Sequence, residues 1–497
     1  MKKIIIIILL LIASKMVHSQ GYNHQWLIGY WPAPYFNGRL NFDTASYIYN
    51  QELRDMKFRG TDGSISDAQG NFLMSSNGVW VANANNDTML NGTGLNPGSE
   101  VNTWPNGLIL PYANVFLPFP GDSTKYALIH HSAEFNGQYY PAIELLYSVI
   151  DLSLDNGLGA IVQKNNSILS DTLNWGIGAC KHANGRDWWI VVQKDLTDEI
   201  HVLLLTPNIV FDYGSQHLGV VPSWGNVAQL TFSQDGTKFG YTSYTPTIGV
   251  DSCFTFIADF DRCSGQFSNT RIFNFFPSGP FWGFAFSPNS KLAYANTSAR
   301  IFQLNIDSML IDTVATFDGF ISGAPPNCCQ TSFAFEYLAA NGKIYLTSGN
   351  GVQHLHEINY PDSVGLVCDV QQHAINLGVW HFRSVPNHPN YNLGPVVGSV
   401  CDSLTIIGIE EQHHDFKFSL SPNPTSDGYI KLVYLLPQNK NGVFEVYNIT
   451  GQLVYQMNLP AWSTLQFVKF PEMSNGVYTC VIKSGYDRVG RKLVILK

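Results

Sequence analysis

A strand–turn–strand unit recurs along residues 20–405 and limits the folds open to this chain. Each copy alternates apolar and polar residues around a turn residue that tolerates a positive φ, which is typical of a β-hairpin. The turns fall at positions 70, 137, 185, 236, 290 and 342, and from 137 onward the steps are 48, 51, 54 and 52 residues. Repeats of this length predict a β-propeller, because one four-stranded blade cannot bury both of its faces alone.

We expect seven blades, with six or eight as alternatives. Strand-like runs precede the first turn, in residues 20–50, and follow the last, in residues 380–401. Sharing one blade between the first and last strands would close the ring and leave no open edge. A Gly- and Pro-rich insertion at residues 91–120 contains Trp104, which we predict to contact a ligand because long loops gather at propeller faces.

The overall composition also favours a loop-rich β protein. Charged residues make up only 13% of the 497, while the chain has 43 glycines and 25 prolines. Residues 20–415 carry 16 Lys and Arg against 33 Asp and Glu, a net charge of −17, whereas residues 416–497 carry a net charge of +5. An acidic main domain is a poor phosphate-backbone binder, so we expect no nucleic-acid partner.

Residues 1–19 are predicted to be a secretory signal peptide. Lys2 and Lys3 precede an apolar run at residues 4–13, and Ser19 ends the predicted cleavage site. A membrane helix needs about 20 apolar residues, so this run is too short to remain as an anchor. The sequence contains no longer apolar run, and we expect no integral membrane span.

Export to an oxidising compartment permits disulfides among the eight cysteines. We expect Cys253 to pair with Cys263 on neighbouring strands, and Cys368 to pair with Cys401 at the end of the main domain. Eight cysteines allow about 105 connectivities, so other pairings stay open. Cys480 is isolated in the C-terminal region and is predicted to be a buried thiol.

Two histidine pairs are candidates for metal binding. His354 and His356 alternate on a predicted strand, share one face and need further ligands to complete a site. No third and fourth ligand is identifiable, so packing histidines are the preferred interpretation. His130 and His131, followed by Glu134, have the same ambiguity, and alternation places their rings on opposite faces.

The remaining patterns do not point to a specific chemistry. Asn83, Asn85 and Asp87 have part of the spacing of a calcium loop, but an Asn-rich turn explains them better. The sequence contains no nucleophile elbow, P-loop or zinc-protease motif. We therefore expect no cofactor, no metal and no motif-encoded catalytic residue, although a propeller can bring carboxylates from different blades together at its axis.

The C-terminal region carries four ordered motifs over about eighty residues. They are Pro422-Asn423-Pro424, a hairpin containing Gly451, Gly476-Val477-Tyr478, and a basic terminal strand with Arg491 and Lys492. This series resembles the type A C-terminal sorting domain of the type IX secretion system of Bacteroidetes. The resemblance implies an Ig-like β-sandwich at residues 416–497 that is recognised by the translocon and sortase machinery. The alternative is an ordinary Ig-like accessory domain.

A second resemblance covers most of residues 20–405. The segments at 71–78, 89–95, 147–151 and 389–395 are similar to WD40-like propellers fused to such sorting domains. Residues 406–415, with the pair His413-His414, are then a solvated linker.

Together these observations predict an all-β chain, a propeller followed by a small sandwich. The protein is expected to be a secreted or cell-surface binding module for a glycan or protein ligand. The alternative is a secreted polysaccharide- or peptide-degrading enzyme with its active site on the propeller axis.

Overall fold

The computed structural model describes two compact units, Met1–Thr405 and Ile406–Lys497. The described residues are 21–30, 36–42, 46–208, 210–222, 229–247, 250–275, 281–322, 329–383, 385–402, 417–436, 440–448, 452–460, 464–484 and 487–496. The predicted signal peptide, the linker with its His413-His414 pair, and Gly451 lie outside these residues. Within them, no helix is long and apolar enough to cross a bilayer.

Unit 1 is built almost entirely of antiparallel strands. A three-stranded sheet contains β1 (Gln25–Ile28), β2 (Phe36–Asn41) and β3 (Ile48–Leu53). An eight-stranded sheet follows, with β4 (Gly63–Ser66), β5 (Phe72–Ser76), β6 (Trp80–Ala82), β7 (Thr88–Thr93), β8 (Asn114–Pro118), β9 (Lys125–Ala133), β10 (Ala142–Asp151) and β11 (Ala160–Leu173). It consists of two meanders, β4–β7 and β8–β11, which meet through the parallel pair Ala160–Leu90.

Four sheets of four strands complete unit 1. They contain β12 (Gly178–Lys181), β13 (Trp188–Gln193), β14 (Glu199–Leu205) and β15 (Val210–His217); β16 (Thr231–Phe232), β17 (Lys238–Thr247), β18 (Val250–Asp261) and β19 (Gln266–Phe275); β20 (Phe281–Phe286), β21 (Leu292–Thr297), β22 (Arg300–Asn305) and β23 (Leu310–Thr316); and β24 (Phe333–Leu338), β25 (Ile344–Ser348), β26 (Val352–Ile358) and β27 (Val370–His381). One short helix, α2 (Ser99–Thr103), lies in the predicted insertion.

The turn between the first two strands of each four-stranded meander requires a positive φ. The residues that adopt it are Gly70, Gly121, Gly185, Gly236, Ser290 and Gly342. Five of these are the predicted turn positions, and their hairpins are confirmed. The predicted turn at 137 instead joins β9 to β10, the second and third strands of their meander, so Gly121 takes the corresponding place.

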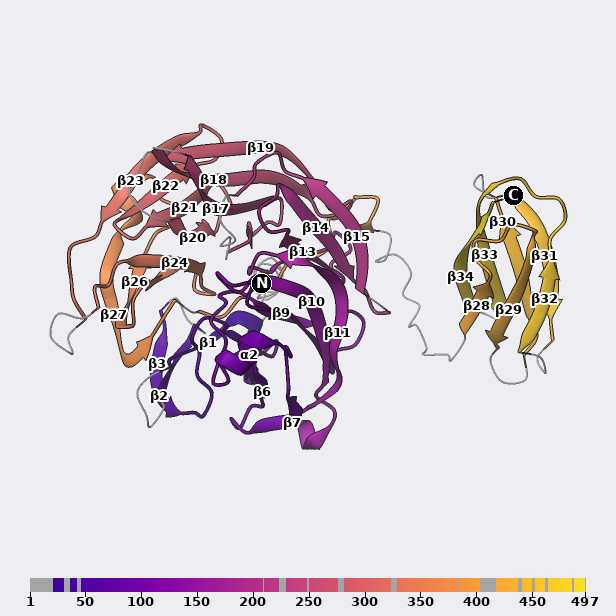
Figure 1. The fold of residues 1–497 in the computed structure, drawn as a ribbon, viewed down its shortest axis with the longest axis horizontal. Coiled ribbons are helices and arrows are strands. Elements are labelled where there is room, and N and C mark those ends of the chain that lie inside the picture. Colours follow the sequence, from indigo (N-terminus) through magenta and orange to yellow (C-terminus); the bar gives the residue numbers. More distant parts are fainter. Residues whose placement is uncertain are drawn as a thin grey trace, which may run out of the picture. The chain divides into compact units, whose positions relative to one another are not determined.

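The sheets of unit 1 succeed one another around a ring (Figure 1). The first and last sheets meet where the Gln51 side chain donates to the Leu377 carbonyl at 3.0 Å and the Tyr30 amide donates to the Trp380 carbonyl at 3.0 Å. The expectation that the first and last strands share one sheet is wrong. Strands β1–β3 and β24–β27 form separate sheets, and residues 385–402 contain no strand.

Aromatic side chains fill the spaces between neighbouring sheets. Trp188 and Trp189 are both fully buried and point to opposite faces of β13, as alternation requires. Trp188 packs edge-on against Tyr391 at 5.7 Å between ring centroids, and Trp189 packs against Phe260 at 6.3 Å. The aromatic residues of unit 1 therefore serve core packing in large part.

Unit 2 is a sandwich of two antiparallel sheets. One contains β28 (Lys417–Ser421), β29 (Tyr429–Leu435) and β32 (Leu465–Lys469), and the other contains β30 (Gly442–Tyr447), β31 (Leu453–Leu459), β33 (Gly476–Ser484) and β34 (Asp487–Ile495). Their inner faces share one apolar core that includes Phe418, Leu432, Phe444, Ile482 and Leu493. The predicted two-sheet β unit is thus present at the C-terminus.

Candidate functional site

The middle of the ring is occupied by residues 385–396, which we call the crossing segment; its trace runs across the ring in Figure 1. Its side chains bind backbone carbonyls that belong to separate sheets or their connections. Asn387 donates to Ile177 at 2.9 Å, His388 to Ser64 at 2.7 Å, Asn390 to Gln234 at 2.6 Å and Tyr391 to Phe116 at 2.8 Å. The chain's own segment therefore lies in the middle of the ring and connects separate sheets.

Sequence reasoning missed this segment because it read residues 380–401 as strand. The sequence nevertheless indicated a break in the strand, since Pro386 and Pro389 lack the amide that a β-ladder needs and are poor strand-interior residues.

Burial fixes the protonation state of two side chains at the centre of the crossing segment. It lowers the pKa of His388 to about 4 and raises the pKa of Tyr391 well above its usual value, so both are neutral hydrogen-bond donors.

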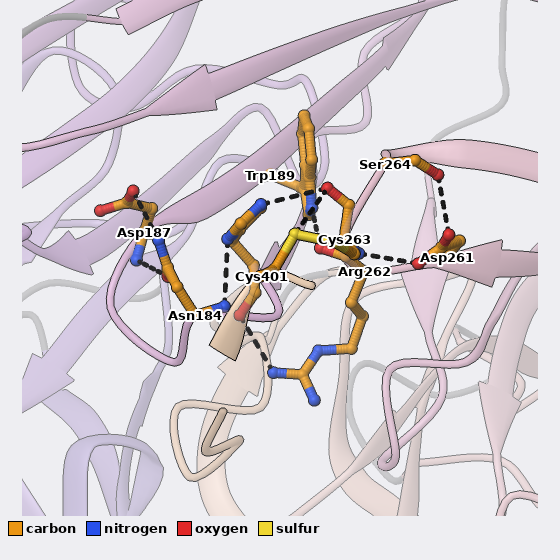
Figure 2. Close-up of a disulfide and its surroundings, with 9 residues drawn as sticks. Asn184, Asp187, Trp189, Asp261, Arg262, Cys263, Ser264 and Cys401 are labelled. Carbon is orange, nitrogen blue, oxygen red and sulfur yellow. Dashed lines mark hydrogen bonds between the residues drawn. A yellow bond between two sulfur atoms is a disulfide. The ribbon is translucent and has the colours of Figure 1, made fainter. Parts of the chain in front are cut away.

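A disulfide between Cys263 and Cys401 fastens the chain just beyond the crossing segment (Figure 2). Arg262, next to Cys263, is buried and donates from Nε to the Lys181 carbonyl at 2.8 Å and from Nη2 to the Gly394 carbonyl at 2.7 Å. Its guanidinium thus joins the β12–β13 turn to the end of the crossing segment. The turn between β18 and β19 therefore holds residues 394–401 both by a hydrogen bond from Arg262 and by the disulfide of Cys263.

Both predicted disulfide pairings are wrong. Cys253 lies near the start of β18 and Cys263 just past its end, so about ten extended residues, roughly 30 Å, separate them. A disulfide needs Cα atoms about 5.5 Å apart, and the Cys263–Cys401 pair has 5.7 Å. Cys368 is a free, buried thiol whose pKa is raised by burial. Cys480 is free and buried, as predicted.

A small cavity of about 40 Å³ remains beside the crossing segment, between β16, β20 and β24. Its polar lining includes Gln229, Glu336, Tyr337, Asn387 and His388. About 10–15 Å³ of such space is enough to hold one water molecule, so this cavity suits a few waters.

Glu336 on β24 is the carboxyl at this cavity. It is fully buried and its Oε1 accepts from Asn296 Nδ2 at 2.6 Å, while its Oε2 has no hydrogen-bond partner among the described residues. Burial raises its pKa to about 8, an effect that the Asn296 hydrogen bond reduces only in part. Glu336 is therefore mostly protonated at neutral pH. Sequence reasoning missed it because it sits in an ordinary strand, with no motif around it.

The predicted histidine pairs are packing residues. His356 is buried and its Nδ1 accepts from the His373 amide at 3.0 Å, while His354 lies 3.1 Å from Ser322 Oγ. His130 contacts Asn96 and Ser148 on one side of β9. Across the described residues, no group of three or more His, Cys, Asp or Glu side chains is arranged to hold a metal.

The Asn-rich segment at 83–87 is a turn, as preferred. The Asn83 side-chain oxygen accepts from the Asn85 amide at 2.9 Å and the Asp87 amide at 3.1 Å, so it is committed to the backbone. Asn86 takes φ 73° at the tip.

Trp104 lies at an aromatic patch on loops of unit 1. We define this aromatic patch as Trp104, Phe135, Tyr140 and Trp175. Phe135 is 52% exposed and lies 5.1 Å from the Tyr140 ring, between centroids. The Trp175 indole donates to the Tyr140 carbonyl at 2.7 Å, and Tyr140 OH donates to Thr103, the neighbour of Trp104, at 3.0 Å.

Trp104 itself is half-buried, and the Arg59 guanidinium lies 4.7 Å from its ring centroid. The insertion, the β9–β10 turn and the β11–β12 connection each contribute to the patch. Hydrogen bonds hold Tyr140 and Trp175 in place before any ligand arrives, which lowers the entropy cost of binding.

In unit 2, Asn423 of the Pro-Asn-Pro motif clamps the terminal strand. Its Nδ2 donates to the Lys492 carbonyl at 2.7 Å and its Oδ1 accepts from the Val494 amide at 2.8 Å. Thr425 then bonds to β34 through the Val494 carbonyl at 2.9 Å and the Leu496 amide at 3.0 Å. The Pro-Asn-Pro motif and the basic terminal strand, the first and last motifs of unit 2, thus lie side by side.

The other motif residues divide between packing and exposure. Tyr478 is buried and its hydroxyl donates to the Ser474 carbonyl at 2.9 Å. Val477, Arg491 and Lys492 are exposed, so they are available to a partner. Pro422 and Pro424 flank Asn423, and both of their peptide bonds are cis.

Residues 419–496 match the model of the secretion system C-terminal sorting domain. Unit 2 is a type IX sorting tail. The protein is therefore secreted to the cell surface or beyond, and unit 2 interacts with the type IX secretion machinery. No curated protein matches the chain.

Solved structures with some likeness to the chain share little sequence with it. A functionally unknown protein from Desulfotomaculum acetoxidans is 11% identical with a TM-score of 0.38, covering 73% of this chain and 99% of its own. KlHsv2 with loop 6CD replaced by a Gly-Ser linker is 9% identical with a TM-score of 0.32, covering 65% and 86%. The extracellular domain of a hybrid two-component system from B. thetaiotaomicron is 8% identical with a TM-score of 0.31, covering 95% and 63%. At these scores they carry no argument about fold or function.

Proposed function

We propose that the protein is an exported binding module that holds a glycan at the aromatic patch of unit 1. The observation that carries the proposal is the position of the crossing segment in the middle of the ring, where its side chains bond to separate sheets. We therefore place the ligand on the outside, where Phe135 is 52% exposed and packs against the half-buried Tyr140. Flat apolar rings suit the C–H faces of a sugar, and Trp104 is the predicted further contact.

We also propose that unit 1 is a seven-bladed, WD40-like propeller of the kind fused to sorting domains in Bacteroidetes. The support is the grouping of strands in chain order: β1–β3, β4–β7, β8–β11 and the four sheets from β12 to β27. Contact between the first and last groups supports ring closure. The predicted signal peptide would deliver the chain to the compartment where the Cys263–Cys401 disulfide forms.

The test is retention of the full secreted chain on a panel of immobilised polysaccharides. We expect Phe135→Ser with Tyr140→Ser to weaken retention about tenfold, because one exposed and one half-buried ring are removed. Trp104→Ala should weaken it as well. Tyr360→Ser with Leu366→Ser removes two side chains of 61% and 77% exposure elsewhere on unit 1 and is the matched control. Equal retention of the patch variant and the wild type would contradict the proposal.

Glu336 favours one alternative, a secreted polysaccharide- or peptide-degrading enzyme, because a buried carboxyl that keeps its proton near neutral pH suits acid catalysis. Substrate access would require the crossing segment to leave the ring. Product release from the same polysaccharides, or from a peptide panel, that is lost in Glu336→Gln would favour this alternative over the binding module.

A further inference from the structure

The outer face of the three-stranded sheet in unit 2 is apolar and basic. We call this outer face, Tyr429, Lys431, Val433, Leu465, Phe467 and Lys469, the sorting face. Its residues stand opposite one another in the register pairs Tyr429–Lys469, Lys431–Phe467 and Val433–Leu465. Phe467 is 74% exposed, and Tyr429, Val433 and Leu465 are exposed as well. A row of exposed aromatic and branched side chains costs solubility, so it indicates a surface made to be covered.

The outer face of the four-stranded sheet has a different character. There, Glu445 accepts from Lys483 Nζ at 2.8 Å and from Tyr447 OH at 2.5 Å, and Gln456 lies 3.5 Å from its other oxygen. The Glu445 carboxylate is thus paired within the unit. The four-stranded sheet also exposes Leu453 and Val477, but among the described residues of unit 2 the exposed aromatic rings, Tyr429 and Phe467, both belong to the three-stranded sheet.

The two lysines of the sorting face have no ion-pair partner among the described residues. Lys469 Nζ lies 4.9 Å from the Tyr429 ring centroid, and Asp427, which Lys469 influences electrostatically, accepts a hydrogen bond from the Tyr429 amide at 3.0 Å. Lys431 stands between Phe467 and Ser421 in the register. Two positive charges inside an apolar surface complement a partner that offers apolar side chains together with carboxylates.

We infer that the sorting face is the surface by which the type IX secretion machinery recognises this protein, through a protein component with an apolar, acidic patch. The match of residues 419–496 to the sorting-domain model calls for a protein partner, and the sorting face supplies the uncovered chemistry. Three strands of five to seven residues span only about 10 Å by 20 Å between backbone atoms. Such a small contact suits transient recognition, in which each cargo must be released again.

The test follows the full chain in cells that carry the secretion machinery. We expect Phe467→Ser with Lys431→Glu to lower the amount at the cell surface and in the medium about tenfold, with folded protein accumulating in the periplasm. The control is Leu453→Ser with Lys440→Glu, which also removes an exposed apolar side chain and reverses the charge of an exposed lysine, but outside the sorting face, and should export like the wild type. Lys431→Arg, which keeps the charge, should also export normally.

Three outcomes would overturn the inference. One is normal export of the sorting-face variant, and another is an equal loss in the control variant. The third is binding of the purified wild-type chain, but not of the sorting-face variant, to vesicles containing phosphatidylglycerol, which would assign the face to an anionic lipid surface. Thermal unfolding of each purified variant checks that unit 2 remains folded. Because glycan retention is measured separately, failure here leaves the proposed binding function of unit 1 unaffected, and the reverse also holds.

Discussion

Asn423 and Tyr391 each fasten a strand-free segment to a β unit, but in opposite surroundings. Tyr391 is buried in the middle of the ring and belongs to a segment that bonds to separate sheets of unit 1. Asn423 is exposed at the edge of unit 2 and bonds to one strand, β34. The comparison teaches that the crossing segment couples distant parts of unit 1, whereas the Asn423 clamp acts locally. Losing the first should destabilise a whole unit, and losing the second should loosen one strand.

The largest effect is expected for Tyr391→Ala. It removes a buried ring that packs against Trp188 and Tyr22, and it leaves a cavity at the centre of the ring. Large-to-small aromatic substitutions in cores lower the free energy of unfolding by about 3–5 kcal/mol. Chemical denaturation of the full chain, with separate probes for each unit, should show the loss in unit 1 only.

Tyr360→Ala is the matched control, because that tyrosine is 61% exposed. Tyr391→Phe keeps the ring and removes only the hydrogen bond to Phe116, so it should cost about 1 kcal/mol. An unchanged unit 1 in Tyr391→Ala would mean that the crossing segment does not couple the sheets.

A smaller, local effect is expected for Asn423→Ala. Two hydrogen bonds to β34 are lost at an exposed edge, so the free energy of unfolding of unit 2 should fall by about 1–2 kcal/mol. Hydrogen exchange should become faster at the Val494 amide, because this amide donates its hydrogen bond to the Asn423 side-chain oxygen. Asn458→Ala, at an exposed position on β31, is the control. Equal loss of protection throughout unit 2 would contradict a local clamp.

The smallest effect is a pH dependence from Glu336. Its folded pKa of about 8 lies above the value near 4.3 expected when unfolded, so the folded state binds the extra proton and a rise in pH destabilises unit 1. Between pH 7 and pH 8 the loss is about 1 kcal/mol.

Glu336→Gln should lack this pH dependence. The free energy of unfolding of the variant should therefore rise relative to that of the wild type as the pH rises, and the two values should lie closer together near pH 5. Asp312→Asn, at an exposed position on β23, controls for the loss of one carboxyl. Parallel pH profiles for the wild type and Glu336→Gln would show that Glu336 does not hold its proton in the folded state.

The sequence predicted local structure better than it predicted what the ring encloses. Gly70, Gly185 and Gly236 marked their hairpins because a positive φ restricts the residue type within a few positions. Tyr391 has no such local constraint, and its place is set by bonds to strands more than a hundred residues away. Apolar–polar alternation predicted strands in residues 380–401, although Pro386 and Pro389 argued against them.

The candidate sites were also hard to predict from the sequence, because they depend on residues that are far apart along the chain. Cys263 and Cys401 are 138 residues apart, and spacing along the sequence favoured nearer partners. Glu336 became notable only through the cavity beside it. In unit 2 the motifs were recognisable, but the sorting face depends on the register between β29 and β32, which no single motif contains.

The position of the Cys263–Cys401 disulfide has a mechanical consequence for export. Unit 2 follows unit 1 along the chain, so a pulling force applied to the sorting tail reaches unit 1 at Cys401 before it reaches the crossing segment. The disulfide passes that load directly to the β18–β19 turn. Residues 385–396 then bear no tension and stay threaded through the ring while the tail is pulled.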